Sequence, residues 1–186
     1  MNLLEALKSA AGGEALDALS RQLRLSHKQT SRGMYCAAST LAVALVLRME
    51  KGLGMPVVSA PTDGNSSSLW VESLLGAGYP SVLHALAEFA QTTPVQAATL
   101  LAFAAETLQS LLGDRIHPGR EDAFIRDIYP QKEALMSTLP ANVVAALDLT
   151  HLQAGLARDF GRGSRIVLRL ALLLLAMALL LGLLLC

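Results

Sequence analysis

The sequence predicts an all-α protein, a multi-helix bundle with two pseudo-repeated helical hairpins, followed by one C-terminal transmembrane helix. Three observations predict this class. Helix caps and helix breakers recur along the chain, whereas no segment alternates apolar and polar residues as a half-buried strand does. A capped, alanine-rich pattern at residues 26–41 returns at residues 93–108. The final segment, residues 166–186, contains a single charged side chain, Arg169.

The composition narrows the function classes. The chain has 186 residues, with 15 Lys+Arg against 15 Asp+Glu. Its formal net charge is therefore zero, and nucleic acid is not expected as a partner. Its two cysteines, Cys36 and Cys186, fit neither a disulfide framework nor a zinc site. Glu5 interrupts the N-terminal apolar residues early, so no signal peptide is expected. We expect the body to be cytosolic and Cys36 to be buried and inert.

The first three helices are bounded by caps and breakers. Asn2 and Glu5 predict a capped helix start, and Gly12-Gly13 predicts a break. Ser26 and Gln29 form the next capping pattern. Helices are therefore expected at residues 3–11, 14–23 and 27–50. The third has about 15 uncharged residues (33–47), too few to cross a bilayer, so it is predicted to be a buried core helix.

A Gly-, Pro- and Ser-rich linker is expected at residues 51–68. Pro80 and Thr93-Pro94 then mark helix starts, because proline is favoured in the first turn. Further helices are expected at residues 69–75, 80–91, 94–112, 120–128, 131–138 and 141–147, with a last one from about 152. The predicted domains are an all-α domain at 1–150 (sub-repeats 1–50 and 69–150), a basic juxtamembrane helix at 151–165 and a transmembrane helix at 166–186.

The repeat relates positions 67 apart, since Ser26 and Gln29 fall on Thr93 and Gln96. Both pairs are capping boxes, which satisfy the first free amides of a helix. The matched positions continue as Ala37/Ala104, Ala38/Ala105, Thr40/Thr107 and Leu41/Leu108. Small residues at these positions allow close helix packing. Either a duplication into two packed hairpins or chance in an Ala- and Leu-rich chain explains the pattern.

The tail is long enough to cross a bilayer. At ~1.5 Å per residue, residues 166–186 span roughly 30 Å as a helix, the thickness of the hydrocarbon core. Leucine occupies every face, which disfavours the alternative of a buried core helix. Ala178 and Gly182 have the small-xxx-small spacing of paired membrane helices, a basis for self-association that composition alone could also produce.

Basic residues orient the predicted anchor. They lie on one helical face leading into the tail, and no charged residue follows the span: Arg158, Arg162, Arg165 and Arg169. The positive-inside rule then predicts a cytoplasmic N-terminal domain. These arginines are the candidate lipid-surface residues, because basic side chains attract anionic headgroups.

Two stretches carry a family resemblance. Residues 1–39 have a short Leu-rich helix, a Gly pair, a second helix and a Ser-x-x-Gln cap, and "YPQKEALMSTLPANVVAALDL" (129–149) has a Gln-Lys segment followed by Leu-Pro-Ala. The chain resembles the YidB-like bacterial family over most of residues 1–150. It departs from the family where Leu-Pro-x-Leu is usual within the long helices. The resemblance implies an all-α bacterial domain of unknown activity, and some relatives carry a periplasmic peptidoglycan-binding domain after a membrane segment.

Catalytic, cofactor and metal sites are not predicted. The histidines are His27, His84, His117 and His151, and none is spaced as a metal pair. The polar stretch 114–122 is read as a solvated connector, with a binding loop as the alternative.

The leading hypothesis is a single-pass inner-membrane module that binds lipid or an unidentified protein at the cytoplasmic face. The alternatives are the cytoplasmic part of a cell-envelope scaffold, an enzyme with a pocket at His117 and Asp122, and a tail-anchored bundle like the apoptosis regulators. The last lacks that family's groove signatures.

Overall fold

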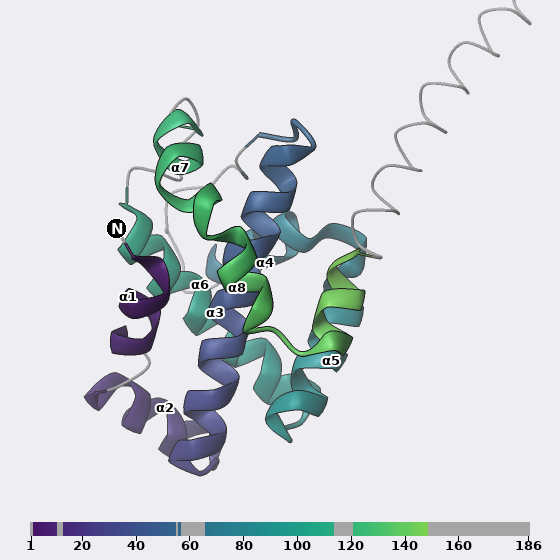
Figure 1. The fold of residues 1–186 in the computed structure, drawn as a ribbon. Helices are drawn as coiled ribbons and strands as arrows, with labels where there is room; N and C mark the ends of the chain where they lie inside the picture. Colours follow the sequence, from purple (N-terminus) through teal and green to yellow (C-terminus); the bar gives the residue numbers. More distant parts are fainter. Residues whose placement is uncertain (1, 11–12, 55, 57–65, 114–120, 149–186) are drawn as a thin grey trace, which may run out of the picture. The chain divides into compact units, whose positions relative to one another are not determined.

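A computed structural model describes residues 2–10, 13–54, 56, 66–113 and 121–148 (Figure 1). The chain divides into two units, Met1–His151 and Leu152–Cys186, and every described residue belongs to the first. The predicted juxtamembrane and transmembrane helices therefore lie outside the described residues.

The described residues are mostly helical and contain no strand, which confirms the all-α prediction. The helices are α1 (Leu3–Ala10), α2 (Glu14–Leu23), α3 (His27–Glu50), α4 (Ser66–Leu75), α5 (Tyr79–Ala90), α6 (Pro94–Leu112), α7 (Glu121–Ile128) and α8 (Lys132–Ser137). Short 3₁₀ helices lie at Gly76–Gly78 and Tyr129–Gln131. Residues 141–148 form one more helical segment.

The central helix is α3, and helices on several sides pack against it (Figure 1). Every residue of the stretch 36–46 is buried. A helix that is apolar on all faces needs neighbours all round, which is the packing predicted for this uncharged stretch. Its most extensive neighbour is α6, and α1, α2, α4, α5, α7 and α8 also contact it.

The start of α4 differs from the sequence prediction. This helix begins at Ser66 rather than Leu69, so the predicted linker 51–68 loses its last three residues to the helix. The reason is tertiary: Ser67 is buried and its hydroxyl donates a hydrogen bond to Glu106 Oε1 on α6, at 3.2 Å. Serine favours linkers because it competes for local backbone bonds, but here a partner on another helix holds it.

The helix predicted for residues 131–138 is present as α8, and it begins one residue later than predicted because Gln131 ends the preceding 3₁₀ helix, Tyr129–Gln131. Gln131 connects this 3₁₀ helix to two other elements. Its Nε2 donates to the Asp127 carbonyl at 2.7 Å, and its Oε1 accepts from the Leu3 amide at 2.8 Å. The Leu3 amide has no partner inside α1, so this bond caps the N-terminal helix through a residue that is distant in the sequence.

Candidate functional site

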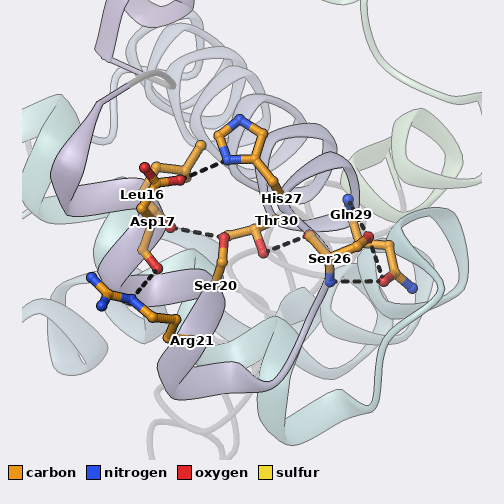
Figure 2. Close-up of polar contacts among 8 residues, drawn as sticks. All are labelled: Leu16, Asp17, Ser20, Arg21, Ser26, His27, Gln29 and Thr30. Carbon is orange, nitrogen blue, oxygen red and sulfur yellow. Dashed lines mark hydrogen bonds and ion pairs between the residues drawn. The ribbon is translucent and has the colours of Figure 1, made fainter.

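The turn between α2 and α3 is closed by backbone and side-chain bonds. Arg24 adopts the left-handed conformation (φ 54°), and the Arg24 and Leu25 amides donate to the carbonyls that end α2. Ser26 then caps α3: its Oγ accepts from the Gln29 amide at 3.2 Å, and Gln29 Oε1 accepts from the Ser26 amide at 3.2 Å. The predicted capping box is therefore present (Figure 2).

An exposed contact between two polar side chains also joins these two helices. His27 Nδ1 lies 2.9 Å from Asp17 Oδ1, and both side chains are about 60% exposed. Figure 2 shows the imidazole reaching from the first turn of α3 back to α2. At such exposure the pair contributes little to stability.

The turn between α5 and α6 has the same construction. Gln91 adopts the left-handed conformation (φ 55°), and the amides of Gln91 and Thr92 donate to carbonyls at the end of α5. Thr93 Oγ1 accepts from the Gln96 amide at 3.3 Å, while Gln96 Oε1 accepts from the Thr93 amide at 2.8 Å. Among the described residues, Arg24 and Gln91 are the only non-glycines with positive φ, and they are 67 positions apart.

Helices α2 and α3 with their turn form one hairpin, and α5 and α6 with theirs form a second. The glutamine of each capping box also forms a hydrogen bond to the other hairpin. Gln29 Nε2 donates to the Gln91 carbonyl at 3.2 Å, and Gln96 Nε2 donates to the Leu23 carbonyl at 2.9 Å. The accepting carbonyls terminate α5 and α2, where no intrahelical donor remains. We call these two bonds the glutamine clasps. In both, the amide oxygen caps its own helix while the amide nitrogen satisfies the opposite hairpin.

Close packing between α3 and α6 lies next to the clasps. A β-carbon added at Gly33 would come within 2.8 Å of Leu100 Cδ1 and 3.1 Å of Ala90 Cβ. Glycine at this position of α3 therefore allows the two long helices to approach each other closely. Gly33 and Leu100 are again 67 positions apart. Nearby, the Arg32 guanidinium stacks over the Phe89 ring at 4.0 Å, joining α3 to α5.

A second polar cluster lies at the other end of α3. Lys132 Nζ is 2.7 Å from Glu50 Oε1 and 2.8 Å from Oε2, and the Tyr129 hydroxyl donates to Oε1 at 3.1 Å. The carboxylate and ammonium are each about one-quarter exposed. The cluster ties the end of α3 to α8 and to the 3₁₀ helix before it.

Nucleophilic chemistry at Cys36 is disfavoured by its surroundings. Its side chain is 1% exposed on α3. Burial raises the pKa of the thiol from 9.0 to about 12, outweighing the opposing hydrogen bond with Thr40 and the charge of Arg32. The thiolate is the reactive form, so this cysteine has the inert environment that the sequence predicted.

Metal-binding clusters of three or more His, Cys, Asp or Glu are absent from the described part of the chain. His27 and His84 are both exposed, on α3 and α5. His117 and His151 lie outside the described residues, so the alternative pocket at His117 and Asp122 is not assembled from described groups.

The predicted lipid-surface residues and the predicted pairing positions also lie outside the described residues: Arg158, Arg162, Arg165, Arg169, Ala178 and Gly182. What sequence reasoning missed is the pair of clasps. The capping boxes were visible as Ser26-x-x-Gln29 and Thr93-x-x-Gln96, but the cross-hairpin role of each amide nitrogen was not. The one available signal was glutamine, rather than glutamate, at both positions.

Comparisons of the chain with protein-family models, curated proteins and solved structures gave no significant match. The resemblance to the YidB-like family therefore stays a prediction.

Proposed function

We propose that the protein is a single-pass membrane module whose helical domain binds protein or lipid at the cytoplasmic face of the bacterial inner membrane. The observation that carries this proposal is the apolar segment 166–186, preceded by basic residues on one helical face. An envelope scaffold that reaches the cell wall through a partner is a narrower form of the same role, suggested by the YidB-like resemblance alone.

Two described helices are also long and apolar enough to cross a membrane, α3 and α6. Most of α3 is covered by other helices of the domain, as in the core of a soluble protein. Fewer residues of α6 are buried, but Ala104, Ala105 and Leu108 are fully enclosed. The burial of α3 and α6 within the domain supports the proposal that residues 166–186, rather than either of these helices, form the span.

We also propose that α2–α3 and α5–α6 are two copies of one hairpin unit. The supporting equivalences are all 67 positions apart: the left-handed residues Arg24/Gln91, the boxes Ser26/Thr93 and Gln29/Gln96, and the contact Gly33/Leu100. Two threonines extend the series: Thr40 Oγ1 donates to the Cys36 carbonyl, and Thr107 Oγ1 to the Phe103 carbonyl.

Fractionation and protease protection test the anchor. The full chain, with an N-terminal tag, should sediment with inner membranes, whereas a chain ending at residue 157 should not. The tag should resist a protease added from the periplasmic side. A full-length protein in the soluble fraction would refute the anchor, and digestion of the tag would refute the orientation.

The arginine stripe is tested separately on vesicles. Replacing Arg158, Arg162 and Arg165 with glutamine should weaken binding to anionic vesicles by about 1 kcal/mol per residue, with little change on neutral vesicles. The controls are Lys28→Gln and Lys51→Gln, which each remove one exposed charge from the domain. Losses of binding are compared per charge removed, and equal losses per charge in both sets would show that only net charge matters.

A further inference from the structure

We propose that the two glutamine clasps are one lock, which fixes the pairing of the α2–α3 and α5–α6 hairpins and opens or closes as a unit. Each clasp takes its donor from one hairpin and its acceptor from the other, in opposite directions: Gln29 to Gln91, and Gln96 to Leu23. Separating the hairpins at one clasp therefore moves the donor and the acceptor of the other.

The closeness of the two clasps to the helix crossing makes this coupling strong. Gly33 follows Gln29 by one turn of α3, and Leu100 follows Gln96 by one turn of α6. At the crossing the residues are fully buried, and an added methyl group already meets Leu100 and Ala90. A packed contact of this kind repacks as a whole rather than stretching, so the backbone segments that carry the two clasps separate only together.

The lock explains why both capping boxes use glutamine. Glutamate at this position also accepts the capping bond, and its charge is favoured at a helix N-terminus. An ionised carboxylate, however, has no donor for the opposite carbonyl. Glutamine at positions 29 and 96 therefore gives up the more favourable charge and keeps the N–H donor that crosses to the other hairpin.

This reasoning predicts the sign of a substitution. Gln29→Glu and Gln96→Glu retain the oxygen that accepts the capping hydrogen bond. If the glutamines served only their own capping boxes, both substitutions should stabilise the helix that follows. With the clasp, each places a carboxylate against a carbonyl oxygen and should lower the folding equilibrium constant about tenfold. The controls occupy the preceding position and change charge by the same amount: Lys28→Gln and Val95→Glu. Both residues are exposed, and their variants should be neutral or slightly stabilising.

Coupling is tested in the double variant and by amide exchange. The full chain is unfolded by urea in mild detergent and followed by the fluorescence of Trp70, its single tryptophan, which is buried on α4. If the two clasps form one lock, combining Gln29→Glu with Gln96→Glu should lower the folding equilibrium constant by clearly less than the product of the two single fold-reductions. In Gln29→Glu, the Arg24 and Thr92 amides, one in each turn, should both lose protection from exchange.

The proposal is overturned if either glutamate variant is as stable as its control. It is also overturned if the fold-reductions in the folding equilibrium constant simply multiply in the double variant, or if amide protection falls in only one of the two turns. Native-state exchange on the unaltered chain provides a check without substitutions. Both turns should share one opening free energy and one denaturant dependence, and distinct values would refute the common lock. The lock rests on described hydrogen bonds, so it stands or fails independently of the membrane anchor.

Discussion

Replacing Gly33 with alanine is expected to destabilise the domain, although alanine is the better helix former. In an exposed helix this exchange gains about 1 kcal/mol. Here the new β-carbon lies 2.8 Å from Leu100 Cδ1 and 3.1 Å from Ala90 Cβ. The leucine methyl group could rotate away in open space, but Leu100 is 0% exposed and its neighbours confine it. Moving Ala90 Cβ requires moving the backbone of α5.

The two terms can be compared. Overpacking a well-filled core costs about 1–3 kcal/mol, and two simultaneous close contacts place Gly33→Ala in the upper part of this range. Subtracting the helix-propensity gain leaves a net loss of about 1–2 kcal/mol in the free energy of unfolding. For a domain of this size, this corresponds to a decrease in Tm of roughly 2–8 °C.

The assay is urea unfolding of the full chain in mild detergent, followed through Trp70. The informative background is Leu100→Ala, which costs about 2–5 kcal/mol by itself but removes the obstructing methyl groups. In that background Gly33→Ala should be much less harmful. Ser110→Ala on the exposed side of α6 serves as the helix-propensity control and should be slightly stabilising. A Gly33→Ala variant more stable than the parent, or equally damaged in both backgrounds, would refute the close-crossing argument.

Other predictions concern the core and its charges. Burial places the folded-state pKa of Cys36 near 12, above its ordinary 9.0, so the stability that depends on its neutral thiol is complete below pH 9. It is lost as pH rises toward 12, and urea titrations of Cys36→Ala should show a smaller alkaline loss. Glu50→Gln and Lys132→Met should each cost about 1 kcal/mol, with a coupling in the double variant. Phe124→Ala, in the core beneath α7, should cost about 3–5 kcal/mol in thermal unfolding, whereas Ile125→Ala, at an exposed position, should cost under about 1.

Local signals predicted most of the described fold. Ser26 and Thr93 are followed three residues later by glutamine, and helices begin directly after both, as expected from capping. The uncharged stretch 33–47 predicted a core helix, and its side chains are indeed almost all buried. These predictions succeed because caps and hydrophobic patterns act within a few residues of the feature they specify.

Features that depend on contacts between distant segments were not predicted. The helix start at Ser66 depends on a bond from Ser67 to Glu106, 39 positions away. The left-handed residues Arg24 and Gln91 lack the glycine that normally marks such a helix end. The clasps were missed for both reasons. Each one joins distant segments, and its acceptor is a backbone carbonyl, which no residue type in the sequence marks.

The separation of contacts along the chain has a consequence for how the protein folds. Within each hairpin, α2 with α3 and α5 with α6, contacts are local, and each turn is closed by its own capping box. Docking of α3 on α6 instead joins residues such as Gly33 and Leu100. Local contacts cost less chain entropy, so each hairpin should acquire structure before the two meet. We therefore expect the rate-limiting barrier at docking. Substitutions at the crossing should slow folding, whereas substitutions in the caps should chiefly change how much of each hairpin is already formed before docking.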